Sequence, residues 1–440
     1  MWPQNPVPMF GRKTARPDLH KLVDDKFGPL FRFQVQKLQH PKPEWWVASA
    51  TVARYPIGSW SAPSAVAAGG ASLDRQEAIA RCLGEGAERY AALNSMATLE
   101  TRVQPSVDSL LNRFPRCDAT EACWESLKGI SPTEQVTQTP VNQLDTDAIV
   151  WAPAGYVHLG FVPSEPERPI TLPISTGLAF SPDLPQAIWR GLCEVAERDA
   201  IMLSWLANRP KAALALSTDA NDDAIAPEIR YRIDALHAAA IRPRLFDISI
   251  DFRAPVVLCL LQSETLPFLT AGASCHEDPV RACCKAVDEA VSVRLALPVA
   301  RSTPCHTDDF RAIDTLEAHA LLYAHWRDSP AVEGFSSNVL EQKPLSDFLE
   351  SASPPAPNSL AELRDVAQRM SGDGLTVLWA DLTTSDLVDL GHVVRVLIPE
   401  LMPLSQRYDA RWLATPRLHR FLRERGVSLA DINVYPHPFA

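Results

Sequence analysis

Two short segments of this chain carry glutamate and arginine in the same order. Residues 83–91 and residues 192–200 both fit the pattern L-x-E-x-A-E-R-x-A. In a helix, residues three apart lie on one face, so the two glutamates of each segment stand about 5–6 Å apart between Cβ atoms. The arginine follows the first glutamate by four positions and can pair with it. Each segment therefore predicts a helix with an acidic face.

Together the two helices predict a site for Mg²⁺ and ATP. Carboxylates brought together repel one another unless a cation lies between them, and Mg²⁺ prefers oxygen ligands that include phosphate. The arginines offer planar forks for phosphate oxygens. The alternative is a solvated helix face whose Glu–Arg pairs contribute about 0.2–0.5 kcal/mol each. The repeat favours the metal site, and neither a P-loop, a G-x-G-x-x-G nor a G-x-S-x-G motif competes with it.

The composition excludes several classes of protein. The chain has 440 residues and a formal net charge of -11, and it has no long block of Lys or Arg, which argues against nucleic acid as a partner. No apolar run approaches the roughly 20 residues of a membrane span, so a cytoplasmic protein is expected. The nine cysteines never form C-x-x-C. The pairs Cys275-His276 and Cys305-His306 lack the spacing that would complete a zinc site.

The pattern of elements predicts an α/β fold, layered in the α+β manner. Helices are expected over about 75–96, 185–206, 227–240 and 279–297, and strands over 45–53, 173–179, 256–261, 375–379 and 393–398. Residues 1–60 are expected to form an N-terminal arm and first strand, and residues 61–440 a single domain with a Pro-rich tail. Residues 101–145 are polar and interrupted by Pro, which predicts a variable excursion.

These residues resemble the YcaO family, ATP-dependent enzymes that activate backbone amides of peptides. The resemblance runs from about residue 45 to the C-terminus. Four stretches carry it: residues 80–90, residues 175–179 with 191–200, residues 272–279 with Glu289 and Arg294, and residues 436–440. The fold that it implies is YcaO-like, with mixed sheets and helices that carry the ATP site.

The resemblance also implies roles for individual residues. The proposed Mg²⁺ ligands are Glu85, Glu88, Glu194 and Glu197. The proposed nucleotide contacts are Arg89, Ser175, Arg198, Glu289 and Arg294. The terminal residues Pro436, Pro438 and Ala440 resemble the Pro-rich end of peptide-cyclising members and are assigned to catalysis. A tail that only packs on the surface is the alternative for these three.

The implied reaction is the conversion of Cys, Ser or Thr in a ribosomal precursor peptide to thiazoline or oxazoline by phosphorylation of the backbone amide oxygen. The implied partners are an E1-like or leader-binding protein and an FMN-dependent dehydrogenase, around a homodimer within a larger complex. Two alternatives remain open. One is thioamide or amidine formation at the same ATP site, and the other is a non-catalytic scaffold subunit.

Some positions depart from the family pattern. Ala71 stands where a phosphate-facing lysine is common, Ser292 replaces a glutamine, and Ala440 replaces the final proline. Thr176 replaces an asparagine after Ser175. None of these departures removes a carboxylate, so the predicted metal site is unaffected by them.

Overall fold

The computed structural model describes residues 18–26, 28–38, 45–53, 66–95, 101–105, 113–114, 135–165, 167, 170–172, 174–216, 225–299, 309–351, 353–409 and 411–440. Within them the strands form three sheets. The first contains, in spatial order, β1 (Leu30–Leu38), β2 (Trp45–Val52) and β3 (Val66–Ser72). The second contains β4 (Arg102–Pro105), β5 (Gln135–Gln143), β13 (Leu378–Asp381), β14 (His392–Leu397) and β7 (Leu178–Ser181), with β6 (Ile149–Pro153) paired to β5. The third contains β11 (Leu269–Cys275), β10 (Val256–Ser263), β9 (Ile241–Asp247), β8 (Ala212–Ala215) and β12 (Glu341–Pro344).

Three long helices each follow the last strand of a β-hairpin or sheet by a short turn. They are α1 (Arg75–Asn94), α3 (Leu184–Leu206) and α5 (Pro279–Ala296). Each begins after an aspartate whose side chain accepts a backbone N–H of the first turn; these aspartates are Asp74, Asp183 and Asp278. Such a cap satisfies an otherwise unpaired donor and fixes where the helix starts. Each helix also carries a glutamate eleven residues after its cap; these are Glu85, Glu194 and Glu289.

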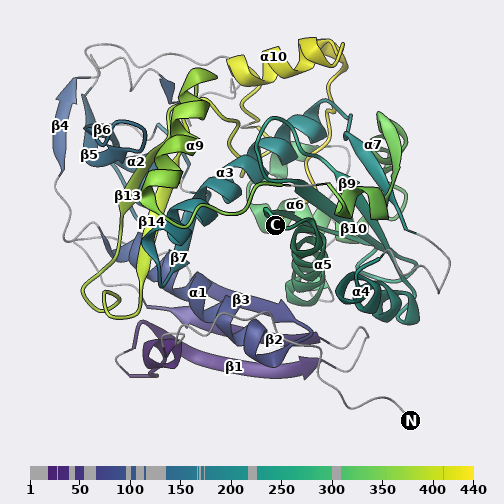
Figure 1. Ribbon diagram of the computed structural model, residues 1–440. Coiled ribbons are helices and arrows are strands. Elements are labelled where there is room, and N and C mark those ends of the chain that lie inside the picture. Colours follow the sequence, from purple (N-terminus) through teal and green to yellow (C-terminus); the bar gives the residue numbers. More distant parts are fainter. Residues whose placement is uncertain are drawn as a thin grey trace.

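The three strand–helix units close into a ring. Helix α1 covers β3 and also touches β7, α3 covers β7 and β14 and also touches β11, and α5 covers β11 and β10 and also touches β3. Figure 1 shows α1, α3 and α5 around the middle of the molecule, with the sheets outside them. The acidic positions of one helix are therefore brought to the strand of the next unit.

Glycines let two of these helices lie directly on their strands. A Cβ on Gly70 of β3 would come within 2.4 Å of the Ala78 carbonyl oxygen of α1. A Cβ on Gly272 of β11 would come within 2.3 Å of the Ala290 nitrogen of α5. Any larger residue would push the helix outward, so these two positions set the helix-to-sheet distance.

Shorter helices cover the outer faces. They are α2 (Ala154–Val157), α4 (Pro227–Ala238), α6 (Leu316–His325), α7 (Pro330–Ser337), α8 (Leu345–Leu349), α9 (Leu360–Gly372) and α10 (Pro416–Glu424). The main core gathers residues of α3, β10, β11, α6, α9, α10 and the chain end. None of the described helices is long and apolar enough to cross a membrane.

The predicted α/β fold is confirmed, and the helices expected near 75–96, 185–206, 227–240 and 279–297 are present within a few residues. The expected excursion over 101–145 is wrong in its second part, because Gln135–Gln143 forms β5, which pairs with β4, β6 and β13. The residues of β5 are mostly polar even where they are buried, so the sequence showed no apolar run there. Leu30–Leu38, expected within the arm, forms the edge strand β1. Cys305 and His306 lie outside the described residues.

Candidate functional site

Five glutamates from the three helices influence one another electrostatically. The charge of Glu194 on α3 raises the pKa of Glu88 on α1, and the charge of Glu289 on α5 raises the pKa of Glu194 and of Glu197. The fold thus brings the acidic faces of both repeated segments together, with Glu289 beside them. All four candidate metal ligands belong to this carboxylate cluster, which we define as Glu85, Glu88, Glu194, Glu197 and Glu289.

Every member of the carboxylate cluster accepts a hydrogen bond from the backbone of a strand or of the residues just before a strand. The donor–acceptor distances are 2.7 Å for Gly69 to Glu85, 2.8 Å for Phe180 to Glu88, 2.9 Å for Cys275 to Glu197 and 3.0 Å for Ala273 to Glu289. Glu194 accepts from the backbone of Gly177. One oxygen of each carboxylate is thereby fixed, which orients the other without adding a competing side chain.

Two of these bonds cross between units of the ring. Glu88 of α1 is held by Phe180 of β7, and Glu197 of α3 is held by Cys275 of β11. The matching position on α5 is Ser292, which has no carboxylate. At that third junction Asp288 of α5 instead accepts hydrogen bonds from Arg81 of α1 and from Trp45 of β2. The second glutamate of each repeated segment therefore joins its own unit to the neighbouring one.

Burial disfavours the ionised form of Glu88, Glu194, Glu197 and Glu289. It raises the pKa of Glu88 to about 8 and that of Glu197 to about 8, and it raises the pKa of Glu194 and of Glu289 as well. The positive charge of Arg198 lowers the pKa of Glu197, Glu194 and Glu289, but the effect of burial is larger and the net shift is upward. Such a cluster gains from a cation, because a cation restores the ionised form that burial disfavours.

The two arginines of the repeat have different surroundings. Arg89 pairs with Glu85, at 2.6 Å between Nη2 and Oε1, and its Nη1 donates to the carbonyl of Ala67. Arg198 lies between Glu194 and Glu197: its Nη2 is 3.9 Å from Glu194 Oε1, and its Nε is 3.6 Å from Glu197 Oε1. The Nε forms no hydrogen bond among the residues that the structure describes. Arg198 thus has a buried donor available beside the carboxylates, which suits a phosphate oxygen.

The remaining predicted nucleotide contacts separate in space. Ser175 precedes β7, two residues before Gly177, and its carbonyl accepts the Leu178 N–H at 2.9 Å. Arg294 lies near the end of α5, and its guanidinium donates to the carbonyl of Pro267 and to Ser263 Oγ, at 2.6 and 2.9 Å. Ser175 thus lies two residues from Gly177, whose backbone holds Glu194, whereas Arg294 is directed to the loop between β10 and β11.

The C-terminal tail is buried rather than laid on the surface. His437 stacks on His319 of α6 with ring centroids 4.0 Å apart, and its Nε2 bonds the Ser405 carbonyl at 2.7 Å. The carbonyl of Pro436 accepts from Tyr323 of α6, and Pro438 is buried while Ala440 is exposed. Burial, with a smaller contribution from the charge of Arg198, lowers the pKa of His437 to about 4.

The charge of Arg198 acts on His437, so the tail lies within electrostatic reach of α3. The C-terminus is marked near the middle of the view in Figure 1, and the tail contacts α6 through Tyr323. Residues 436–439 are buried, so the alternative of a tail that only packs on the surface is wrong for them. The roles of Pro436, Pro438 and Ala440 in the reaction remain predictions.

The carboxylates present fit Mg²⁺ better than a metal held by the protein alone. Among the described residues, no group of three or more His, Cys, Asp or Glu side chains stands close enough to hold an ion by itself. The glutamates instead form pairs along α1 and α3. Mg²⁺ usually takes one or two protein carboxylates and completes its octahedron with water and substrate phosphates. The cluster therefore suits an ion that arrives with a nucleotide.

Several functional groups of this site were not found from the sequence. The anchoring donors are backbone N–H groups, which no residue type reveals. Arg395 of β14, which influences Glu194, was also missed. Its signal was present, because it is the one charged residue within the apolar run 393–398. A lone arginine in a buried strand demands a partner or a function.

Gly177 is expected to be indispensable to the position of Glu194. Its φ is +84°, and a Cβ there would lie 2.1 Å from the Val396 carbonyl oxygen of β14. Gly177→Ala should therefore displace the backbone that binds Glu194 and weaken Mg²⁺–ATP binding by roughly tenfold or more, a loss of about 1.4 kcal/mol. Isothermal titration with ATP and Mg²⁺ measures this. Gly374→Ala is the matched control, because its φ is +82° and nothing lies within 4 Å. Equal affinities in both variants would contradict the expectation.

The metal-free protein should lose stability as the pH rises. The pKa of Glu88 and of Glu197 lies near 8, above 4.5 for an ordinary glutamate. The stabilising effect of their protons is complete below pH 4.5 and is lost as the pH rises from 4.5 through 8, because over this range the unfolded chain has released these protons while the folded protein still holds them. We expect the unfolding temperature in EDTA to fall more steeply between about pH 5 and 8 in the wild type than in Glu88→Gln. Parallel curves would show that Glu88 is ionised throughout.

The ring of three strand–helix units, with paired carboxylates and buried arginines at its centre, defines a nucleotide-dependent enzyme of mixed α/β architecture that uses a divalent cation. A family model described as "YcaO cyclodehydratase, ATP- and Mg²⁺-binding" matches residues 69–402. The chain belongs to the YcaO family. This confirms the predicted family and the predicted cofactors, ATP and Mg²⁺.

Solved structures share the fold at low identity. A heterocyclase in complex with substrate and cofactor has a TM-score of 0.70 at 16% identity, over 99% of this chain and 59% of that one. YcaO from Methanopyrus kandleri, bound with AMPPCP and Mg²⁺, has a TM-score of 0.56 at 18% identity, over 84% and 86%. The E. coli microcin synthetase McbBCD complex has a TM-score of 0.55 at 19% identity, over 84% and 88%.

A curated relative is an uncharacterized protein in the tfuA 3′ region of Rhizobium leguminosarum bv. trifolii, 26% identical over 236 residues, which are 48% of this chain and 54% of that protein. Another, from Methanothermobacter thermautotrophicus, is 26% identical over 342 residues, which are 76% of this chain and 82% of that protein. The matched part thus spans little more than half the length of the first relative and of the heterocyclase chain.

Proposed function

We propose that this chain uses ATP to activate a backbone amide of a ribosomally made peptide and so forms an azoline ring. A Cys, Ser or Thr side chain of the peptide attacks the preceding carbonyl carbon, and the amide oxygen takes the γ-phosphoryl group of ATP. Loss of that oxygen as phosphate leaves the thiazoline or oxazoline ring. The products are the ring, ADP and inorganic phosphate, so one water is lost from the peptide for each ATP.

The observation that carries this proposal is the anchored carboxylate cluster. Glu85, Glu88, Glu194 and Glu197 would hold Mg²⁺, which neutralises phosphate charge when it is bound. Backbone bonds already fix one oxygen of each, so little reorganisation is needed on binding. Phosphoryl transfer depends mainly on this kind of positioning and charge neutralisation.

Arg198 is the residue that we assign to the transferred phosphoryl group. It is almost enclosed, its Nε makes no hydrogen bond among the described residues although it lies 3.6 Å from Glu197 Oε1, and the cluster on either side holds it in place. The pKa of its guanidinium is raised by the charges of Glu197, Glu194 and Glu289 against the effect of burial, so it stays a cation. A fixed cation beside the metal ligands is suited to negative charge that develops on phosphate oxygens.

The buried tail supports the peptide-cyclising branch. Pro436 is held by Tyr323 of α6 and His437 by the Ser405 carbonyl, and the tail lies within electrostatic reach of Arg198. We propose that its end, Ala440, lies where the peptide is processed. A leader-binding partner is also proposed, supported by the fold shared with the E. coli microcin synthetase McbBCD complex, which has been solved with pro-MccB17 bound.

The test is mass spectrometry of a precursor peptide encoded beside this chain, incubated with the chain, its neighbouring partner proteins, ATP and Mg²⁺. We expect loss of one water per ring, dependent on both ATP and Mg²⁺. Sulfide-dependent product would instead establish thioamide formation. Tight ATP binding with no change in peptide mass, under conditions where the partners also bind, would establish a scaffold subunit and overturn the proposal.

A further inference from the structure

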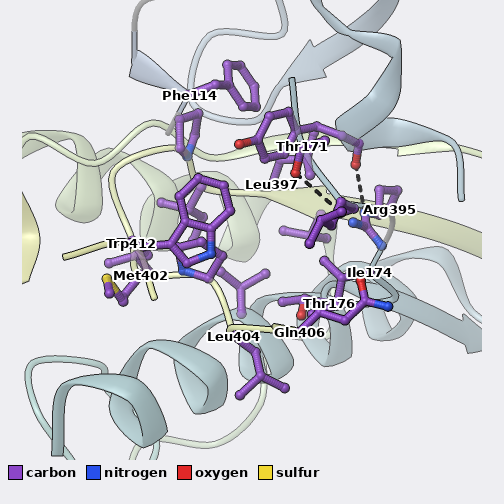
Figure 2. Close-up of a pocket in the computed structure, with 18 residues that line it drawn as sticks. Phe114, Thr171, Ile174, Thr176, Arg395, Leu397, Met402, Leu404, Gln406 and Trp412 are labelled. Atoms are coloured by element: carbon purple, nitrogen blue, oxygen red, sulfur yellow. Dashed lines mark hydrogen bonds between the residues drawn. The ribbon is translucent and has the colours of Figure 1, made fainter. Parts of the chain in front are cut away.

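A small chamber lies beside the carboxylate cluster and is not used by it. It is lined by β14, by the loop that follows β14 and by residues that precede β7, and its cavity volume is about 60 Å³. Figure 2 shows apolar side chains on its walls, among them Leu397, Leu404, Met402 and Trp412. One water needs on the order of 10–15 Å³ of such volume, so the room is that of about four to six non-hydrogen atoms. This is the size of an aliphatic side chain.

The chamber contains one cationic donor without a protein partner. Arg395 is 4% exposed, and its Nε donates to the Tyr156 carbonyl at 3.1 Å. Its Nη1 is buried and has no hydrogen-bond partner in the part of the chain that the structure describes. Burial lowers the pKa of this guanidinium to about 10, so it remains charged at neutral pH. An unpaired buried cationic donor is costly, and native proteins retain one where a ligand completes it.

The chamber also contains one acceptor without a partner. Gln406 lines it, and its Oε1 is buried with no donor within hydrogen-bond distance among the described residues. Figure 2 shows the Gln406 and Arg395 side chains near Ile174 and Thr176. A peptide group has one acceptor, its carbonyl oxygen, and one donor, its N–H. The unpaired groups of the chamber are complementary to it.

The chamber adjoins the reaction site. Thr176 and Val195 line it, and they follow Ser175 and Glu194 in the chain. The charges of Arg395 and Glu194 also act on each other. A peptide residue held here would lie next to the residues to which the amide activation is assigned.

We propose that this chamber binds one apolar residue of the substrate peptide, with its aliphatic side chain among Leu397, Leu404 and Met402 and its peptide group between Arg395 Nη1 and Gln406 Oε1. The inference rests on the proposed function for its substrate, a peptide, and adds a preference for a leucine-sized residue next to the processed one. Specificity arises because a small residue leaves the chamber unfilled and a charged one leaves its own charge without a partner.

The probes for the test are capped single residues, titrated into the full chain and followed by ligand-observed NMR. N-acetyl-leucinamide carries the side chain and two peptide groups. N-acetylglycinamide lacks the side chain, and N-acetyl-leucine has a free carboxylate. We expect N-acetyl-leucinamide to bind at least tenfold tighter than either of the others. Equal binding of the leucine and glycine probes, tightest binding of the free acid, or no binding at all would overturn the proposal.

Variants separate this site from the ATP site. Leu404→Phe fills the chamber and Gln406→Leu removes its acceptor, so each should weaken N-acetyl-leucinamide binding at least tenfold. Leu340→Phe makes the same change as the first at a position that is 48% exposed and should leave binding unchanged. Affinity for ATP with Mg²⁺ is measured in every variant and should not change. Probe binding without any ATP binding would sink the proposed function and leave the chamber standing, whereas ATP binding with unaltered probe binding in both chamber variants would refute the chamber alone.

Discussion

Glu197→Gln is expected to reduce ATP-dependent loss of water from the precursor peptide by on the order of 10³-fold or more. Glutamine keeps the shape of the side chain and can still accept the Cys275 N–H. What it removes is one negative charge from a buried cluster whose task is to hold Mg²⁺ against phosphate. The loss should therefore be accompanied by weaker Mg²⁺ dependence of ATP binding, with little change in the unfolding temperature of the metal-free protein.

The measurement is initial-rate mass spectrometry of the peptide, with a Mg²⁺ titration at saturating ATP. Glu88→Gln is expected to behave alike, because Glu88 is held in the same way by Phe180 of the next unit. Glu317→Gln is the matched control, since Glu317 is an exposed residue in the first turn of α6. Rates within twofold of the wild type in both cluster variants would remove Glu88 and Glu197 from the proposed site.

Asp288→Ala is expected to destabilise the fold by about 3–5 kcal/mol, because it leaves buried cations without a counter-charge. Asp288 has 0% exposure and accepts from Trp45 Nε1 at 3.1 Å, from Arg232 at 2.9 Å through both Nε and Nη2, and from Arg81 at 3.0 Å. It joins α5 to α1, α4 and β2. Its loss should also loosen Glu289, the next residue.

Thermal unfolding measures this effect as a fall in the unfolding temperature of about 3–6 °C for a cooperative unit of this size. Asp234→Ala on the exposed face of α4 is the control and should shift it by less than about 1 °C. If Asp288→Ala and Asp234→Ala unfold at the same temperature, the network does not hold the third junction together.

The parts of the fold that could be predicted from sequence are those set by local chemistry. The capping aspartates and the three- and four-residue spacing of Glu85, Glu88 and Arg89 act within one helix, so pattern alone locates it. The same applies to apolar runs such as β10. Strand β5 was missed because its residues are mostly polar and form no apolar run. The strand is stabilised instead by pairing with β4, β6 and β13, which the local sequence does not reveal.

The site was predicted as a set of residues but not as an arrangement. The sequence indicates which carboxylates are involved, because the pattern recurs. It does not indicate that Arg294 turns to the Pro267 loop, that Arg395 enters an apolar chamber, or that the tail is buried against α6. Each of these depends on contacts between residues far apart in the chain, which no local pattern encodes.

The bonds between units of the ring also affect how this protein matures. Glu88 finds its backbone partner 92 residues later in the chain, and Glu197 finds its own 78 residues later. Strand β14, which carries Arg395, is synthesised later still. A chain emerging from the ribosome therefore has no complete nucleotide site until most of it has been made, because two of the four ligands, Glu88 and Glu197, are oriented by strands that follow them. Premature capture of ATP by a partly made chain is thereby avoided, and fragments that end before β11 should be inert toward nucleotide.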